Sequence, residues 1–182
     1  MKKTLILFDG PQGVGKDAVI RELIKSNPKL KSLPSYATRK MRTGEVNGDT
    51  HWFIDDATFL KKLETGDIFE HTIFHNTYRG MSKAIIDEIL NNGSIGIKSI
   101  DILGLRLLRK MYPNQVLSIF ITADKNIIRN RLAVLGDPEI DARLSNYDER
   151  HKYINESDYI VENNGTLDEV VQKVQAILSG HI

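Results

Sequence analysis

The residues whose types and spacing most clearly indicate a chemical function form one stretch near the N-terminus, Phe8-Asp9-Gly10-Pro11-Gln12-Gly13-Val14-Gly15-Lys16-Asp17. This stretch fits the phosphate-binding pattern G-x-x-x-x-G-K, but Asp17 stands where Ser or Thr normally follows. The glycines allow close backbone approach to an anion, and the N–H groups of the loop and of the next helix can point at it. Lys16 adds a positive charge that can reach the β- and γ-phosphates. We therefore predict that this loop binds phosphate.

The elements on either side of the loop are those that the pattern requires. The apolar run Thr4–Phe8 is typical of a buried parallel strand, and apolar residues recur at helical spacing between Ala18 and Ile24. The alternative is a glycine-rich turn before an ordinary helix. It leaves unexplained why Lys16 stands at the positive end of the helix dipole.

A second group of cations follows at a distance along the chain. Arg39 and Arg42 lie three residues apart beside the end of a short predicted strand, and Arg79 follows in the same region. Guanidinium groups match phosphate oxygens in a bidentate way. A solvated basic face is the alternative. Beside a phosphate loop, however, a second anion site is favoured, because a kinase needs one site for its donor and one for its acceptor.

The order of elements predicts the fold class. Strands alternate with helices to the end of the chain, which favours a P-loop NTPase-type α/β fold, a parallel sheet with helices on both faces. Between about Ser35 and Gly80 short strands follow one another with little helix, as expected of a small mixed-strand insertion. Residues 139 to about 153 are expected to form one polar helix. We expect a single domain over 1–182, with a core at 1–33 and 82–182 and an insertion at about 34–81.

Composition narrows the classes of partner. The 182 residues include 25 Lys and Arg against 24 Asp and Glu, so the net charge of +1 gives no field for nucleic acid or a membrane surface. The absence of cysteine excludes disulfides and thiolate metal sites and fits a reducing compartment. The N-terminal apolar run is too short for a signal peptide or a span. We expect a cytoplasmic protein with small-molecule substrates; monomer and homo-oligomer remain open.

One segment carries a family resemblance. Thr38-Arg39-Lys40-Met41-Arg42-Thr43-Gly44-Glu45-Val46-Asn47-Gly48 closely resembles the T-R-x-x-R-x-G-E-x-[ND]-G signature of guanylate kinases, which are P-loop nucleoside monophosphate kinases. The phosphate loop and later segments follow in the family order. The resemblance implies a kinase that uses ATP and Mg²⁺ to phosphorylate a nucleoside monophosphate, GMP or dGMP. It also implies a mobile acceptor-binding insertion and a short lid at about 133–143.

The resemblance also implies roles for individual residues. ATP would bind through the loop and one later residue, namely Gly10, Pro11, Gln12, Gly13, Val14, Gly15, Lys16, Asp17, Ala18 and Asn163. The acceptor would contact Ser35, Arg39, Arg42, His51, Glu70, Tyr78, Arg79 and Asp101. Among these, Ser35, Glu70 and Asp101 would face the guanine. The catalytic cations would be Lys16, Arg39, Arg131 and Arg143.

The chain departs from the family pattern at several positions. His51 and Arg79 stand where the family has Tyr, and Met81 stands where it has Ser or Thr. Both replacements for Tyr can still donate to a phosphate, whereas Met81 weakens or changes base recognition. Leu135 stands where the family has a second lid arginine, and loss of that cation could cost much of the rate.

The most informative departure is paired. The family has Ser or Thr directly after the loop lysine and Asp-x-Asp at the end of a central strand, which is expected here at Ser94–Ile100. In this chain Asp17 follows Lys16, and Ser99 stands in place of the first Asp of that sequence. Our hypothesis is that Asp17 and Ser99 jointly hold Mg²⁺ or its waters, since oxygen ligands of both types suit that ion. The alternative is that Asp17 merely caps the first helix, at a position where the helix dipole favours a carboxylate.

Two other functions stay open at this point. An Asp after the loop lysine, together with Asn163-Asn164-Gly165-Thr166-Leu167, also resembles ribose 1,5-bisphosphate phosphokinases, although that group shares the segment from Arg39 to Gly48 poorly. Guanylate-kinase-like domains of scaffold proteins bind peptides without catalysis. Those modules typically lack an intact phosphate loop, which this chain retains.

Overall fold

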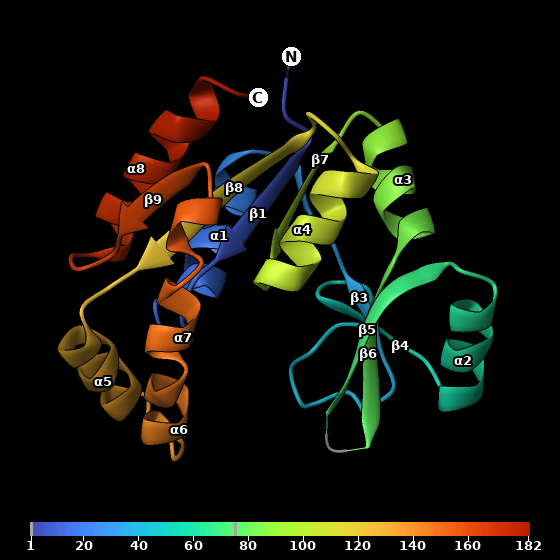
Figure 1. Cartoon of the computed structure of the whole chain (residues 1–182), viewed down its shortest axis with the longest axis horizontal. Helices are drawn as coiled ribbons and strands as arrows, with labels where there is room; N and C mark the ends of the chain where they lie inside the picture. Colours follow the sequence, from blue (N-terminus) through green and yellow to red (C-terminus); the bar gives the residue numbers. More distant parts are fainter. Residues whose placement is uncertain (1, 75) are drawn as a thin grey trace. The chain divides into compact units, whose positions relative to one another are not determined.

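The structure, a computed structural model, describes residues 2–74 and 76–182 (Figure 1). The chain divides into two compact units, one made of Met1–Pro28 with Ile97–Ile182 and the other of Lys29–Gly96. We describe each unit by itself. Within the described residues, no helix has the length and the apolar character needed to cross a bilayer.

The first unit is built from alternating strands and helices. Its elements are β1 (Leu5–Asp9), α1 (Lys16–Ser26), the end of β7 (Ile95–Ser99), α4 (Ile102–Met111), β8 (Val116–Thr122), α5 (Lys125–Val134), α6 (Ile140–Ser145), α7 (Tyr147–His151), a 3₁₀ turn (Ile154–Glu156), β9 (Tyr159–Glu162) and α8 (Leu167–Ser179). The expected polar helix is therefore divided, because α6 ends before Asn146 and α7 begins after it.

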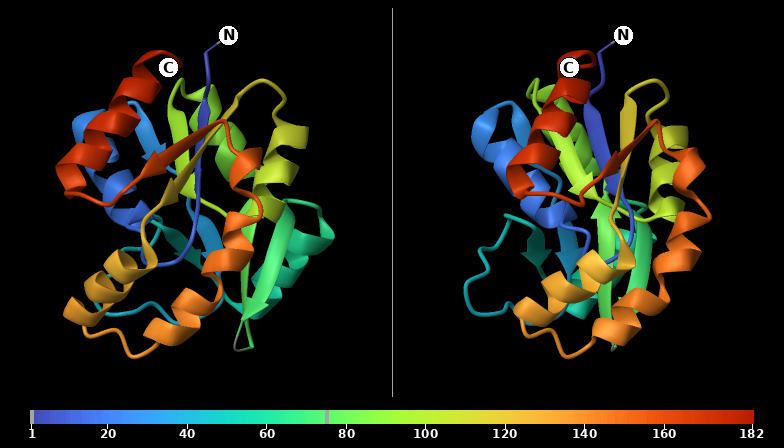
Figure 2. Two further views of the ribbon diagram at one scale, coloured as in Figure 1. Left: turned by 60° about the vertical axis from the view of Figure 1, so that its left-hand side comes forward. Right: turned by 90° about the vertical axis from the view of Figure 1, so that its left-hand side faces the viewer.

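The sheet of this unit is parallel and buried. Within this unit its strand order is β7-β1-β8-β9. Strand β1 pairs in parallel with β8, so that Asp9 lies opposite Phe120, and β8 pairs in parallel with β9. Every residue of β1 and β8 is buried, as expected when helices cover both faces of a parallel sheet. Helices α1 and α8 pack together on one face, while α4 lies on the other (Figure 2). The predicted α/β class with helices on both faces of a parallel sheet is confirmed.

The second unit carries a smaller mixed sheet. Its elements are β2 (Leu30–Ser32), β3 (Ser35–Ala37), β4 (His51–Phe53), α2 (Asp56–Glu64), β5 (Ile68–Phe74), β6 (Thr77–Ser82) and α3 (Lys83–Asn91), and it also includes the start of β7. The four-stranded order is β4-β3-β6-β5, with β3 parallel to β4 and β6 antiparallel to both β3 and β5. Buried Phe59 of α2 stacks on Tyr78 at 5.2 Å between ring centroids. The predicted mixed-strand sheet is thus present.

Two side-chain caps define the helix starts of this unit. The Asp55 side chain accepts a hydrogen bond from the Thr58 N–H at 2.7 Å, and the Ser82 hydroxyl accepts one from the Ile85 N–H. Such caps satisfy N–H groups that a helix leaves unpaired at its first turn. They fix where α2 and α3 begin on either side of the β5–β6 hairpin.

Candidate active site

The glycines of the phosphate loop have conformations that other residues adopt with difficulty. Gly10, Gly13 and Gly15 have φ values of +133°, +81° and +93°. A Cβ on Gly10 would lie 2.0 Å from the carbonyl oxygen of Ile121, which is backbone and cannot move aside easily. The loop therefore depends on glycine both for its turn and for its close approach to the end of β8.

Lys16 begins α1 and folds back over the loop. Its Nζ donates to the carbonyl oxygens of Gly10 and Pro11, each at 2.7 Å. Burial lowers the pKa of Lys16 to about 8, although the carboxylates of Asp17 and Asp9 oppose the shift. An ammonium whose charged form is disfavoured by its surroundings gains from an anion beside it, so Lys16 is poised for a phosphate.

Asn163, in the turn after β9, joins the loop to the C-terminal part of the unit. Its Nδ2 donates to the carbonyl oxygen of Val14 at 2.8 Å, while its Oδ1 is buried and has no hydrogen-bond partner among the described residues. Arg131 of α5 donates to the carbonyl oxygens of Asn163 and Gly165 at 2.8 and 2.7 Å. In this structure Arg131 thus holds the turn that carries Asn163.

The two predicted lid positions differ in their surroundings. Arg143 of α6 donates to Oε1 of the loop residue Gln12 at 3.3 Å and pairs with Asp137 at 2.8 Å. Leu135, directly after α5, is 79% exposed. One predicted arginine therefore reaches the phosphate loop, and the position of the missing one faces solvent.

Sequence reasoning did not single out Asp9 or Arg150. Asp9 is 2% exposed; its Oδ1 accepts from the Gly10 N–H at 2.7 Å and lies 3.3 Å from Nη1 of Arg150 in α7. Burial raises the pKa of Asp9, and the hydrogen bond from Gly10 and the charge of Arg150 oppose that shift. The signal in the sequence was an acidic residue at the end of an otherwise apolar strand, since a buried carboxylate requires a partner.

The predicted metal ligands lie in the first unit. Asp17 is exposed in the first turn of α1, and Ser99 is half-buried at the end of β7. Within the described part of the chain, no three acidic or histidine side chains are grouped as a ready-made metal site. Mg²⁺ commonly uses one or two carboxylates together with substrate phosphates and waters, so these oxygen donors are of the right kind. Asp101 is engaged otherwise, because its Oδ1 caps α4 by accepting from the Gly104 N–H at 2.9 Å.

In the second unit, Glu45 organises the arginine-bearing loop. Its carboxylate receives two hydrogen bonds from Arg39, at 2.5 and 2.7 Å, and one from the Arg42 N–H at 2.7 Å. These bonds, led by the one from Arg39, lower the pKa of Glu45 to about 2. The bidentate pair fixes the Arg39 guanidinium, which also lies 5.0 Å from the ring centroid of Phe53.

Arg79 of β6 joins this cluster. The Nε atoms of Arg39 and Arg79 are buried without a hydrogen-bond partner in the described residues. Burial lowers the pKa of Arg79, and the charges of Arg39 and Arg42 lower it further. In the part of the chain that the structure describes, the charges of Arg39, Arg42 and Glu45 act on Arg79, so three guanidinium groups share one carboxylate. An imbalance of this kind fits a bound anion.

The sheet register aligns several other predicted acceptor residues. Ser35 is buried and lies opposite His51, while half-buried Glu70 lies opposite Met81. Tyr78 stacks on Phe59, as described above. Seven of the eight predicted acceptor residues therefore lie in the small sheet or in a loop that flanks it. The eighth, Asp101, belongs to the first unit.

The glycine loop carries a lysine and lies between a buried strand and a helix of a parallel α/β sheet. These features define a P-loop phosphotransferase. The family model described as guanylate kinase matches residues 1–181. A guanylate kinase of Helicobacter pylori (strain ATCC 700392 / 26695) is 35% identical over 163 residues, which cover 87% of this chain and 79% of that protein. One of Clostridioides difficile (strain 630) is 32% identical over 165 residues, covering 89% and 80%. This chain belongs to the guanylate kinase family.

A solved structure agrees at the level of the fold. The crystal structure of guanylate kinase from Anaplasma phagocytophilum superposes with a TM-score of 0.75 at 22% identity, covering 98% of this chain and 86% of that one. The predicted family and the predicted class, a guanylate-kinase-like phosphotransferase, are confirmed. The individual site residues stay predictions.

Proposed function

We propose that this chain transfers the γ-phosphoryl group of ATP to GMP or dGMP, forming GDP or dGDP. The observation that carries the proposal is the family match over residues 1–181. The relatives reported above bear the name guanylate kinase, so neither a ribose 1,5-bisphosphate kinase nor a catalytically inert binding module is favoured.

The two cationic clusters supply the two anion sites that the reaction needs. The phosphate loop and Lys16 hold the donor phosphates, and Arg39, Arg42 and Arg79 grip the acceptor phosphate. Phosphoryl transfer depends on bringing the two anions into line and neutralising their charge, and it requires no covalent protein intermediate. Arg143, which already contacts Gln12 of the loop, serves as a cation for the transferring group.

Base recognition falls to carboxylates and a hydroxyl. Glu70 can accept from the N1–H and N2–H₂ groups of guanine, a donor pair that adenine lacks, and Ser35 and Asp101 complete the predicted set. Asp101 keeps one oxygen for such a contact while the other caps α4. His51 and Tyr78 are assigned to the acceptor phosphate side. Buried Met81, opposite Glu70, leaves an apolar wall where the family has a hydroxyl.

Asp17 and Ser99 are the residues that we assign to Mg²⁺. When bound with ATP, the ion would neutralise part of the charge of the phosphates, and Asp17 and Ser99 would be its protein ligands. The carboxylate of Asp17 also acts on Lys16, whose pKa it raises. Mn²⁺ binding in the presence of ADP, followed by electron paramagnetic resonance, tests the assignment without turnover. Asp17→Ala should weaken Mn²⁺ binding, and unchanged binding would leave Asp17 as a residue that interacts only with the dipole of α1.

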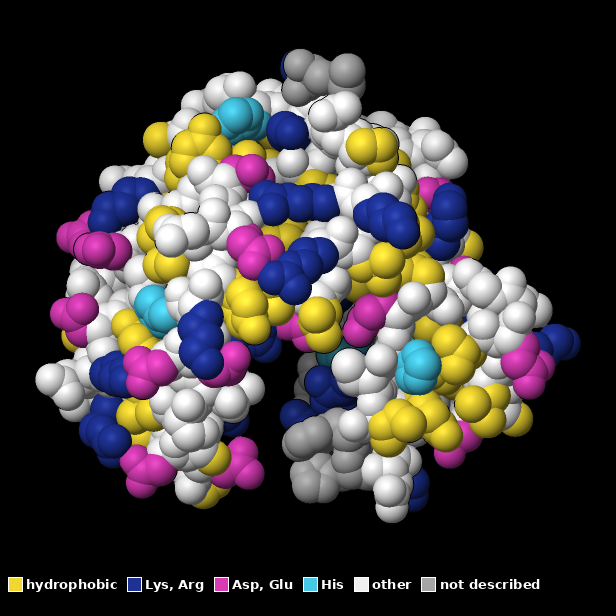
Figure 3. Space-filling view, viewed as in Figure 1, with side chains coloured by type: hydrophobic (Ala, Val, Ile, Leu, Met, Phe, Trp, Pro, Cys, Tyr) yellow, Lys and Arg dark blue, Asp and Glu magenta, His cyan; other side chains and the backbone are white. Residues whose placement is uncertain are grey.

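Domain movement and location complete the proposal. We propose a core at 1–33 and 82–182, an acceptor-binding insertion at about 34–81 and a lid at about 133–143 that close on the substrates and exclude water. The near-neutral net charge of +1 agrees with small-molecule substrates. The face seen in Figure 3 likewise intersperses acidic and basic side chains. We assign the protein to the cytoplasm.

An acceptor screen tests the function directly. ATP and Mg²⁺ are supplied with GMP, dGMP, AMP, CMP, UMP or ribose 1,5-bisphosphate at equal concentration, and ADP release is followed. We expect kcat/KM for GMP to exceed that for AMP by ~10⁴-fold. The acceptor groups that bind the guanine N–H donors would have no hydrogen-bond partner when adenine is bound. Turnover of ribose 1,5-bisphosphate without turnover of GMP would overturn the proposal. An increase of Tm with ATP but no turnover of any acceptor would indicate a binding module.

A further inference from the structure

A charge pair at the base of the phosphate loop has no role in the mechanism above. Asp9 ends β1 directly before the loop, and Arg150 reaches it from α7 with Nη1 3.3 Å from Oδ1. The Asp9 side chain is 3% exposed and that of Arg150 is 31% exposed. A carboxylate so deeply buried is costly unless a cation and hydrogen bonds compensate it. Its presence at this position therefore calls for an explanation.

The pair lies beside the reactive end of the loop. The charges of Asp9, Lys16 and Arg150 act on one another: Asp9 raises the pKa of Lys16, and Arg150 lowers it. Lys16 itself rests on the carbonyl oxygens of Gly10 and Pro11, immediately after Asp9 in the chain. The Arg150 guanidinium is thus a second cation next to the ammonium that meets the β- and γ-phosphates.

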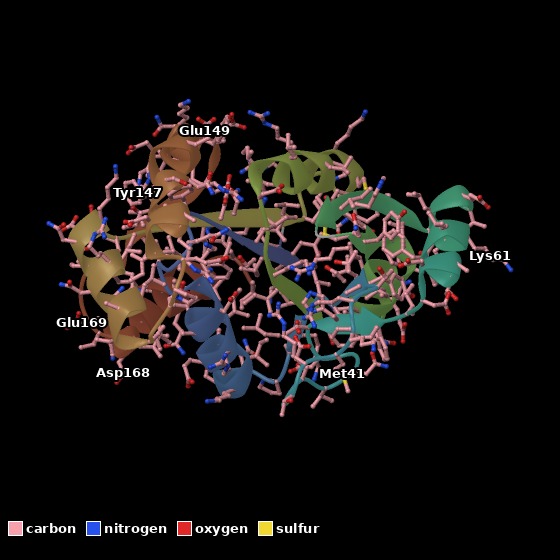
Figure 4. All side chains as sticks on the ribbon, turned by 90° about the horizontal axis from the view of Figure 1, so that it is seen from below. Met41, Lys61, Tyr147, Glu149, Asp168 and Glu169 are labelled. Atoms are coloured by element: carbon pink, nitrogen blue, oxygen red, sulfur yellow. The ribbon has the colours of Figure 1, made fainter. Side chains whose placement is uncertain are left out.

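Helix α7 is fixed to the core at this edge of the sheet. The Tyr147 hydroxyl donates to the carbonyl oxygen of Ala123 at 3.0 Å, and His151 Nε2 lies 2.7 Å from the Thr122 hydroxyl. Thr122 ends β8, the parallel neighbour of β1, and Ala123 follows it, so α7 is anchored beside the carboxyl end of β1. In Figure 4, Tyr147 and Glu149 are seen on the ribbon of α7, which carries Arg150 next in sequence. The backbone of α7 that carries Arg150 is therefore held in place by these contacts.

The contact with Asp9 differs from the bidentate arginine–carboxylate pairs of the chain. Arg106 donates to both oxygens of Glu156, at 2.9 and 2.6 Å, and Arg39 does the same with Glu45. Arg150 engages Asp9 through one nitrogen at the long distance of 3.3 Å. Such a contact orients a guanidinium and leaves its remaining N–H groups outside the pair. Those groups can turn to phosphate oxygens.

The predicted lid leaves a need for such a cation. Exposed Leu135 carries no charge, and Arg131 is engaged by the carbonyl oxygens of Asn163 and Gly165. We propose that Arg150 is a further catalytic residue that contacts the γ-phosphoryl group of ATP, and that Asp9 is the positioning residue that aims it. This inference rests on the proposed function. Arg150 of α7 would supply the positive charge that is missing at the lid position of Leu135.

Kinetics of point variants test the proposal. Arg150→Ala should lower kcat by ~10²-fold while the KM for GMP changes little, because one transition-state cation is lost and the acceptor site is untouched. Arg150→Lys keeps the charge pair with Asp9 and should still lose ~10-fold in kcat, since an ammonium lacks the guanidinium fork. The matched control is Arg106→Ala, which removes an arginine paired on the surface and should retain the wild-type kcat.

A double-mutant cycle separates catalysis from structure. If Arg150 only compensates buried Asp9, then Asp9→Asn combined with Arg150→Ala should restore kcat, because the uncompensated charge is gone. Our proposal expects the opposite: the double variant stays as slow as Arg150→Ala. Asp9→Asn alone should lower kcat by a smaller factor. Recovery of the wild-type kcat in the double variant would overturn the catalytic role.

A binding measurement keeps the test independent of the acceptor. A residue that contacts the γ-phosphoryl group distinguishes ATP from ADP, so Arg150→Lys and Arg150→Ala should reduce the ratio of ATP to ADP affinity several-fold. Unchanged ratios together with unchanged kcat would refute the inference. If the wild-type protein turns over no GMP, the proposed function fails, whereas the affinity ratio still decides the role of Arg150. Thermal unfolding of each variant verifies that it is folded.

Discussion

Asn163 donates from Nδ2 to the carbonyl oxygen of Val14 at 2.8 Å, a hydrogen bond that ties the turn after β9 to the middle of the phosphate loop. Both residues are buried, at 4% and 0% exposure. The loop is therefore shaped partly by a residue 149 positions away in the chain.

Asn163→Ala should destabilise the fold and impair the donor site together. It leaves the buried Val14 carbonyl without its partner, which costs about 1–3 kcal/mol in the free energy of unfolding. A loosened loop should also raise the KM for ATP several-fold. Urea unfolding and ATP titration measure the two effects. Asn130→Ala, at an exposed site on α5, is the control and should change neither; a stable variant with an unchanged KM for ATP would contradict the role of Asn163.

Gly10→Ala should abolish the loop conformation. The added Cβ would lie 2.0 Å from the carbonyl oxygen of Ile121, in addition to the strain of φ +133°. Gly93→Ala is the matched control because Gly93 also has a positive φ, +72°, but a Cβ there meets nothing within 4 Å. We expect the first variant to be unfolded or unable to bind ATP, and the second to lose only ~1 kcal/mol of stability. Circular dichroism and ATP-induced Tm shifts distinguish them, and equal losses would show that φ alone matters.

The phosphate loop and the alternating elements around it were predictable because their signals are local. An apolar strand, three glycines, a lysine and a helical repeat follow one another within residues 4–24. The arginine cluster was also predictable, since Arg39 and Arg42 are neighbours in sequence and Glu45 follows them closely.

The contacts made by tertiary packing could not be predicted in the same way. The pair between Asp9 and Arg150 spans 141 positions, and no local pattern links an acidic strand end to an arginine in a polar helix. Arg131 was assigned to the lid by resemblance, but only the fold reveals the two carbonyl oxygens that hold it. The division between α6 and α7 at Asn146 could not be predicted either, because polar residues predominate on both sides of it.

ATP binding should depend on pH through Lys16. Its pKa is lowered to about 8 by burial, so the ammonium that meets ATP is present below pH 8 and is lost above it. ATP affinity should therefore fall as pH rises through 8, by up to ~10-fold per pH unit. Isothermal titration calorimetry between pH 7 and 9.5 measures this slope. Lys16→Arg does not titrate in that range and should give a flat profile; the same slope in both proteins would exclude Lys16 as its source.

The same shift predicts an effect of opposite sign on stability. The unfolded chain has an ordinary lysine pKa of 10.5 and binds the proton more tightly than the folded one. Between pH 8 and 10.5 the contribution of Lys16 to the free energy of unfolding should therefore rise with pH. Urea unfolding of the wild-type and Lys16→Met proteins over this range isolates the contribution. A difference between them that does not vary with pH would contradict the lowered pKa.

Arg79→Met should weaken acceptor binding and also stabilise the folded protein. The guanidinium of half-buried Arg79 is repelled by Arg39 and Arg42, and its buried Nε has no hydrogen-bond partner in the described residues. Removing its charge while keeping an unbranched side chain should raise Tm. It should also raise the KM for GMP by ~10-fold, since a charge-assisted contact to phosphate is lost. The KM for ATP should stay within about twofold, because the donor site is unchanged.

Arg106→Met is the control for this opposition between stability and binding. Arg106 pairs bidentately with Glu156 at the surface, so its loss should leave the KM for GMP unchanged and bring no gain in Tm. A fall in Tm for Arg79→Met with an unchanged KM for GMP would show that Arg79 supports the sheet. A rise in Tm with a raised KM would show that the cluster keeps an unfavourable charge because the acceptor phosphate requires it.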